Sequence, residues 1–241
     1  MPVTQKEIIS RLQQNILQWE GYRPPEAGVC ELMGLGAIEA AFPNGVFALG
    51  TVHELICSNM EQATASEAFV SGLLSVLMQK GGACLWIGLS NHVSPLALKA
   101  FGVAPERVVF LNLLQDKEVL WAMEEALKYG GLAAVVGEVS ELDFKQSRRL
   151  QLAVEQSRVT GFVLRNRSKK MQSTACAARW QVSHLPSEPV DGLPGLGFPR
   201  WQVDLLRVRN GKPGRWIMEW AAGRFKIATP VVAAVTERMV G

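Results

Sequence analysis

Between residues 52 and 165, short apolar runs alternate with amphipathic segments, and this alternation constrains the fold more than any other feature of the sequence. The runs at 83–88 (ACLWIG) and 132–139 (LAAVVGEV) are continuous and of strand length, and 160–165 (TGFVLR) resembles them. Continuous apolar runs of this length are typical of parallel strands that are covered on both faces. A further strand is expected around 52–57.

The segments between these runs carry apolar residues at helical spacing. Residues 67–79, 116–129 and 144–157 are expected to be helices, and Gly-Gly pairs follow the first two. Strands that alternate with helices form a parallel α/β sheet.

The pattern changes after residue 178, where strands are expected at 179–184, 201–209 and 215–220 with no helix between them. Asn-Gly at 210–211 and Pro-Gly at 213–214 predict a hairpin between the last two strands. In this hairpin Trp201, Val203 and Leu205 face Trp216, Met218 and Trp220. The fold class is therefore α/β, with a mainly parallel central sheet flanked by helices and extended by antiparallel C-terminal strands.

The N-terminal segment predicts a short separate helix. Thr4 and Glu7 have the spacing of a capping box, and an apolar stripe follows it at helical period. This stripe either packs on the body of the protein or binds a partner. Its members are Ile8, Leu12, Ile16 and Trp19. Proline and glycine then end the helix, so we divide the chain into an N-terminal helix and linker (1–41), one domain (42–226) and a C-terminal tail (227–241).

Composition excludes several other classes of protein. No apolar run reaches the ~18 to 20 residues of a membrane span, and the N-terminus lacks a signal peptide, so we expect a cytoplasmic protein. The four cysteines are far apart and have no histidine at ligand spacing, which indicates reduced core residues with no disulfide framework or metal site. His53, His92 and His184 lack any nucleophile motif and are expected to be structural or surface residues.

The net charge of +3 hides a strong asymmetry along the chain. Residues 1–144 carry 8 Lys and Arg against 16 Asp and Glu, whereas residues 145–226 carry 16 against 5. A polyanion or acidic partner near the second half would explain this difference, and so would scattered surface Lys and Arg.

Several stretches together resemble the ImuA family of RecA-related proteins. They are 42–45 (FPNG) with 52–55 (VHEL), 113–144, 147–165 (SRRLQLAVEQSRVTGFVLR) and 199–220 (PRWQVDLLRVRNGKPGRWIMEW). The resemblance implies a RecA-like core, a bacterial cytoplasmic location and a role in damage-induced mutagenic DNA repair.

The resemblance also implies an ATP site, whose parts are missing from this sequence. A phosphate cradle needs glycines and a lysine, yet Ala63 stands at the lysine position and only Thr64 matches. Gly137 replaces the metal-organising Asp, with Glu138 displaced to the opposite strand face, and Ser90 replaces the water-activating Glu. We therefore expect no ATPase activity and no cofactor.

A basic loop follows the strand that ends at Arg165. In RecA-like proteins the corresponding loop touches single-stranded DNA, and here it carries Arg165, Arg167, Lys169 and Lys170. These charges could neutralise phosphates, although no aromatic residue lies among them for base stacking. An ordinary solvated loop is the alternative.

The resulting functional hypothesis is a non-catalytic adaptor in SOS-induced translesion synthesis. The resemblance implies a Y-family polymerase homologue (ImuB) and an error-prone C-family polymerase as partners. RecA and single-stranded DNA are further candidates. The alternatives are an ATP-dependent recombination mediator and an SOS cell-division inhibitor.

Overall fold

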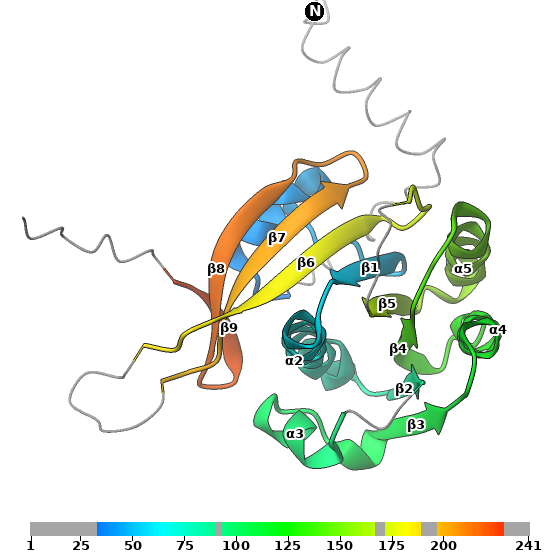
Figure 1. Cartoon of the computed structure of the whole chain (residues 1–241), viewed down its shortest axis with the longest axis horizontal. Helices are drawn as coiled ribbons and strands as arrows, with labels where there is room; N and C mark the ends of the chain where they lie inside the picture. Colours follow the sequence, from blue (N-terminus) through cyan, green and yellow to red (C-terminus); the bar gives the residue numbers. More distant parts are fainter. Residues whose placement is uncertain (1–32, 90–92, 167–171, 189–196, 229–241) are drawn as a thin grey trace, which may run out of the picture. The chain divides into compact units, whose positions relative to one another are not determined.

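The computed structural model describes residues 33–89, 93–166, 172–188 and 197–228 of the chain (Figure 1). In these ranges the strands are β1 (Val52–Cys57), β2 (Ala83–Gly88), β3 (Val108–Asn112), β4 (Leu132–Val139), β5 (Thr160–Asn166), β6 (Ala178–Leu185), β7 (Arg200–Val208), β8 (Gly214–Ala221) and β9 (Arg224–Ile227). The α-helices are α2 (Met60–Leu77), α3 (Pro95–Ala100), α4 (Asp116–Leu127) and α5 (Phe144–Ser157). Short 3-10 helices occur at η1 (Gly36–Ala41), η2 (Pro43–Gly45), η3 (Met78–Lys80) and η4 (Pro105–Arg107).

All of these strands belong to one sheet, in the order β3-β2-β4-β5-β1-β6-β7-β8-β9. The strands from β3 to β6 in this order pair in parallel. Strands β6 to β9 pair antiparallel. The prediction of a mainly parallel α/β sheet with antiparallel C-terminal strands is therefore confirmed.

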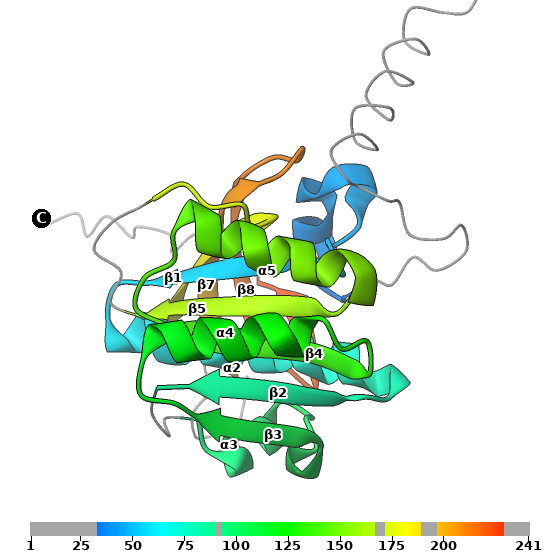
Figure 2. The same cartoon turned by 90° about the vertical axis from the view of Figure 1, so that its right-hand side faces the viewer.

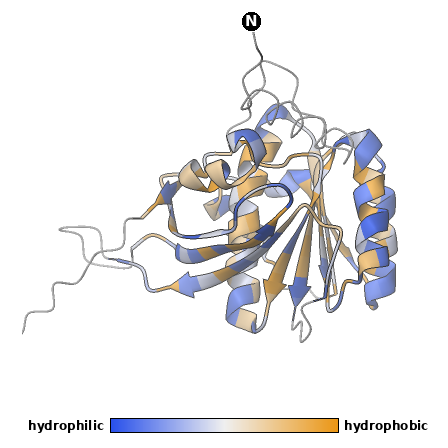
Figure 3. Cartoon of the chain, turned by 90° about the horizontal axis from the view of Figure 1, so that it is seen from above, coloured by the Kyte–Doolittle hydropathy of each residue, from blue (hydrophilic) through white to orange (hydrophobic). Residues whose placement is uncertain are grey.

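Helices cover both faces of the parallel part of the sheet (Figures 1 and 2). Phe69 of α2 and Leu98 of α3 belong to the hydrophobic core on one face. Met123 of α4 and Val154 of α5 belong to the core on the other face. Figure 3 shows hydrophobic residues concentrated on the central strands, as two-sided burial requires.

The C-terminal hairpin forms, and two of the three predicted pairs are confirmed: Trp201 pairs with Met218, and Val203 pairs with Trp216. Leu205 pairs with Gly214, and Trp220 pairs with Phe225 of β9. The tryptophans of β7 and β8 join the core that α2 covers. The antiparallel strands therefore continue the same hydrophobic layer and do not form a second domain.

Residues before the predicted domain boundary contribute to this core. Met33, Leu35 and Ile38 are almost fully buried, and the compact unit begins at Met33. The predicted stripe at Ile8, Leu12, Ile16 and Trp19 lies outside the described residues. Within the described ranges, no helix is both long and apolar enough to cross a membrane.

His53 is a core residue, as predicted. Its ring stacks on Phe47 at a centroid distance of 4.5 Å, and Nε2 lies 2.7 Å from the carbonyl oxygen of Ala48. Burial lowers the pKa of His53 to about 4, so the ring is neutral at physiological pH. His184 lies on the surface, and His92 lies outside the described residues.

Burial also determines the protonation state of the cysteines. The described cysteines, Cys57, Cys84 and Cys176, are free and buried, in agreement with their prediction as core residues. Desolvation raises the pKa of the Cys84 and Cys176 thiols to about 12, which keeps them protonated. Cys30 lies outside the described residues.

The close packing of α2 on the antiparallel strands predicts the effect of Gly72→Ala. The added Cβ would lie 2.5 Å from Cζ of Phe225 and 3.1 Å from Cζ3 of Trp220. Overpacking costs ~1–3 kcal/mol, which exceeds the ~1 kcal/mol that alanine contributes as a better helix former. We expect a lower midpoint in urea unfolding.

A second substitution makes this test specific. Phe225→Leu provides room for the new methyl group, so the double variant should lose less stability than the sum of the two single variants. A Gly72→Ala protein more stable than the wild type would contradict the packing account.

Candidate functional site at the carboxyl edge of the sheet

The connection from β1 to α2 occupies the position predicted for a phosphate-binding loop. The backbone amide of Gln62 donates to Oδ1 of Asn59 (2.8 Å), and the amide of Ser58 donates to Oε1 of Gln62 (2.9 Å). Ala63 is buried and Thr64 is exposed. A phosphate cradle presents backbone amides to its ligand, and here the amides of Ser58 and Gln62 donate to side chains of the connection itself.

Strand β4 contains Gly137 and Glu138, the two residues at the position predicted for the metal-organising Asp. Its register with β5 is unbroken at residues 137 and 138, so the two residues face opposite sides, as predicted. A Cβ on Gly137 would lie 2.7 Å from Sδ of Met123, and the glycine therefore allows α4 to pack closely. Glu138 is buried on the other face, where Oε1 accepts a hydrogen bond from Nε1 of Trp86 (2.7 Å). Ser90 lies outside the described residues.

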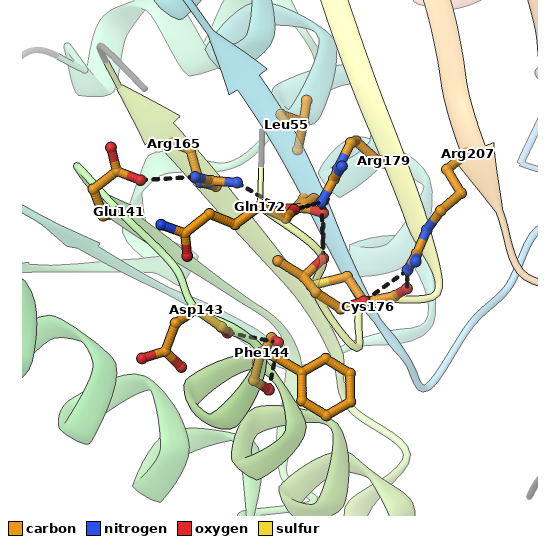
Figure 4. Close-up of polar contacts among 12 residues, drawn as sticks. Leu55, Glu141, Asp143, Phe144, Arg165, Gln172, Cys176, Arg179 and Arg207 are labelled. Atoms are coloured by element: carbon orange, nitrogen blue, oxygen red, sulfur yellow. Dashed lines mark hydrogen bonds and ion pairs between the residues drawn. The ribbon is translucent and has the colours of Figure 1, made fainter. Parts of the chain in front are cut away.

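A buried carboxylate joins β1, β5 and β6 next to this edge, and Figure 4 labels Arg165, Arg179 and Glu141 among the residues around it. Glu54 is fully buried, and its oxygens accept from Nε of Arg179 (2.6 Å) and Nη1 of Arg165 (3.3 Å). The hydroxyl of Thr174 also donates to Glu54. Arg165 extends this network outward through its Nη2, which lies 2.9 Å from the half-exposed carboxylate of Glu141. We call these five residues the Glu54 network.

The network corrects one assignment made from the sequence. Arg165 was expected to contact nucleic acid, but its side chain has no exposed surface and pairs with Glu54 and Glu141. A guanidinium group held in this way is not available to a phosphate. Arg167, Lys169 and Lys170 lie outside the described residues, so their assignment stays a prediction.

Arginines also hold the segment that leads from this basic loop into β6. Nη2 of Arg207 donates to the carbonyl oxygens of Thr174 (2.9 Å) and Cys176 (2.7 Å). Nη2 of Arg179 donates to the carbonyl oxygen of Gln172 (2.5 Å). The described residues that follow the basic loop are therefore fixed by charge-assisted hydrogen bonds to the backbone (Figure 4).

Five of the 16 basic residues of the second half form ion pairs within the described residues, and three of them, Arg165, Arg179 and Arg200, are buried. The ion pairs that involve arginines of this half are Arg149–Glu124, Arg165–Glu54, Arg165–Glu141, Arg179–Glu54, Arg200–Glu188, Arg200–Glu219 and Arg215–Asp204. Three of the carboxylates, Glu54, Glu124 and Glu141, come from the acidic first part of the chain. The charge asymmetry thus reflects internal pairing as well as the exposed surface.

Sequence reasoning missed the roles of Glu54, Arg179 and Trp86. The available signal was a charged residue inside an apolar run, as with Glu54 in VHELIC and Glu138 in LAAVVGEV. Such residues are almost never fully buried without a partner, so they predict an interior polar contact. The identity of the partner depends on the strand order, which the sequence does not state.

Comparison with known proteins identifies the family. The chain is 34% identical over 198 residues to Protein ImuA of Caulobacter vibrioides (strain NA1000 / CB15N), which covers 77% of this chain and 81% of that protein. This chain belongs to the ImuA family. The resemblance inferred from the sequence is thereby confirmed.

A second relationship covers part of this ImuA family member. Residues 50–161 match the family model described as cell division inhibitor SulA. The SulA of Photorhabdus laumondii is 27% identical over 146 residues, covering 57% of this chain and 82% of that protein. The SulA of Yersinia enterocolitica is 29% identical over 129 residues, covering 53% and 76%.

The Glu54 network predicts unequal effects for two charge-neutralising variants. Glu54→Gln leaves the arginine charges of Arg165 and Arg179 without their buried counter-charge, and we expect a loss of ~3–5 kcal/mol in the free energy of unfolding. Glu141→Gln removes a carboxylate that is half exposed and should cost about 1 kcal/mol or less. Urea unfolding measures both values. Equal losses would contradict a central role for Glu54.

Proposed function

We propose that this ImuA family member is a non-catalytic accessory protein in damage-induced mutagenesis. Family membership supports the role in mutagenic DNA repair. The observation that supports a binding role is the β1–α2 connection, where the loop's own side chains accept from the amides of Ser58 and Gln62. In this proposal the protein has a RecA-like core whose nucleotide site has lost its function.

The chemistry at the edge of the sheet supports the absence of ATP hydrolysis. No lysine is present in the β1–α2 connection, and Glu61 would bring a like charge toward a phosphate. Gly137 supplies no metal ligand. These features also argue against an ATP-dependent recombination mediator.

The proposed partners are the Y-family polymerase homologue ImuB and an error-prone C-family polymerase, with RecA as a further candidate. The family resemblance is the basis for this set. The N-terminal stripe, whose residues are given above, remains our candidate contact for one of these partners. Its apolar residues would bury against a complementary groove if the segment forms an amphipathic helix.

Single-stranded DNA is a further proposed ligand, through Arg167, Lys169 and Lys170. The support is the placement of this basic loop between β5 and a segment that Arg179 and Arg207 hold in position. A loop whose flanking segments are held in position loses less conformational entropy on binding than a loop whose flanking segments are free. Binding would be independent of sequence because it depends on phosphate neutralisation.

A genetic test separates this proposal from a catalytic role. Deletion of the gene should lower the frequency of damage-induced mutation, and a plasmid copy should restore it. A Thr64→Ala copy should restore it equally, because Thr64 would be needed only to hold magnesium in an active nucleotide site. Failure of Thr64→Ala to complement, with normal protein levels, would contradict a non-catalytic function.

The SulA relationship favours a second candidate, an inhibitor of cell division. The matched range, 50–161, contains the strands β1, β2, β3 and β4 together with helices α2 to α5. Overproduction in undamaged cells discriminates between the two functions. Filamentous growth would favour the inhibitor, whereas normal division together with recovery of ImuB in a pull-down would favour the accessory protein.

The nucleic-acid proposal predicts a change in salt dependence. Replacement of Arg167, Lys169 and Lys170 by Ala should reduce the slope of log K against log salt concentration by ~2, since each phosphate contact on a single strand contributes ~0.7. Fluorescence anisotropy with an oligothymidylate over a salt series measures the slope. Lys117→Ala, Lys145→Ala and Lys212→Ala together provide a control with the same change in charge. An unchanged slope in the loop variant would show that this loop does not bind DNA.

A further inference from the structure

A cavity of about 270 Å³ opens at the carboxyl ends of β2, β3 and β4. Its inner wall contains Trp86 and Glu138, which are both 2% exposed. Phe110 forms another wall. Ser94 and Asn112, which are exposed, lie at the mouth. The cavity thus has a buried carboxylate at its base and an opening to solvent.

The topology of the sheet favours a ligand at this position. Strand β2 leads to α3 on one face, while its neighbour β4 leads to α5 on the other face (Figure 1). The two helices thus pack on opposite faces of the sheet, and the cavity lies at the carboxyl ends of the two strands. In open α/β sheets ligands bind in crevices at such positions, outside the carboxyl ends of the strands.

The charge inside the cavity selects against a phosphate. Glu138 lines the cavity, and Glu67 of α2 interacts with Glu138 from the neighbouring helix. Desolvation, and secondarily the charge of Glu138, raise the pKa of Glu67 to about 7. A carboxylate in the wall thus favours a cation over an anion in this cavity.

The residues of the cavity wall and the cavity volume restrict further which ligands can bind. The rings of Trp86 and Phe110 offer π faces that attract cations, and the hydrogen bond from Nε1 of Trp86 fixes the indole beside the carboxylate. Cofactor pockets usually measure about 300–1,000 Å³, so this cavity suits a single side chain better than a nucleotide. Leu96, 75% exposed, follows Pro95 of the cavity wall and provides an apolar surface for a larger partner.

We propose that this cavity binds the side chain of one arginine or lysine from a partner protein. The cationic group lies against Glu138 and beside the neighbouring rings of Trp86 and Phe110, and the stem of the side chain passes Asn112 at the mouth. This inference takes from the proposed accessory function only one assumption, that the protein has a protein partner. Failure of the titration below would leave the genetic test of that function unaffected.

The test is a titration of the full-length ¹⁵N-labelled protein with the peptide Ac-Ala-Ala-Arg-Ala-Ala-NH₂. The indole N–H signal of Trp86, assigned with Trp86→Phe, reports on the cavity. We expect a saturable shift with the arginine peptide and none with the matched citrulline peptide, which has nearly the same shape but no charge. Equal shifts with both peptides would overturn the proposal.

Two variants identify the contacts. Glu138→Gln keeps an acceptor for Trp86 but removes the charge, and should weaken binding of the arginine peptide by about tenfold or more. Glu106→Gln, at an exposed position with the same change in charge, should leave binding unchanged. If Glu138→Gln does not fold, Phe110→Leu is the test variant. We expect it to weaken binding of the arginine peptide by about two- to fivefold, because the aromatic wall is lost. Unchanged affinity in the folded Glu138→Gln or Phe110→Leu protein would contradict the assigned contacts.

A final comparison identifies the source of the cation. Agmatine carries the same guanidinium group on a short stem but has no peptide backbone. Tighter binding of the peptide than of agmatine supports a protein partner, because the contacts outside the cavity then contribute. Equal or tighter binding of agmatine would overturn the protein source in favour of a small free amine.

Discussion

The buried carboxylate of Glu54 is the interaction on which the junction between the two parts of the sheet depends. It lies on β1, between the parallel strand β5 and the strand β6 that begins the antiparallel extension. Its counter-charges come from both neighbours, Arg165 on β5 and Arg179 on β6. A carboxylate in the interior is strongly unfavourable without such neighbours, so only a strand order that supplies both cations satisfies it.

Ionic complementarity extends beyond this position. Acidic residues from the first part of the chain pair with arginines from the second part on α5, β5 and β6. Three carboxylates of the acidic first part, Glu54, Glu124 and Glu141, are neutralised in this way by arginines of the basic second part. The buried arginines of these pairs hold the strands together, and Arg179 also holds the segment before β6.

Features that depend on neighbouring residues in the sequence could be predicted, whereas contacts between distant parts of the chain could not. Helical periodicity predicted α4, and alternation predicted the inward face of β7, because burial on one side of an element is a local pattern. Continuous apolar runs predicted the parallel strands that are covered on both faces. The hairpin of β7 and β8 was also predictable, since Asn210 and Gly211 provide its turn signal. The order of the parallel strands was not, because the connections from β1 to β5 pass through helices and give no pairing information. For the same reason the sequence predicts a nucleic-acid contact for Arg165, whereas its partners lie on β1 and in the connection that follows β4.

The central position of β1 has a consequence for the order of events in folding. β1 is the first strand of the sheet in sequence, yet both of its neighbours lie much later, with Arg165 and Arg179 separated from Glu54 by 111 and 125 residues. During synthesis, β2, β3 and β4 are complete before either edge of β1 can be paired. Contacts of such long separation slow folding, and the unpaired edges of a waiting strand are open to other chains. The nascent chain is thus most vulnerable to aggregation until β6 emerges from the ribosome and closes the sheet around its first strand.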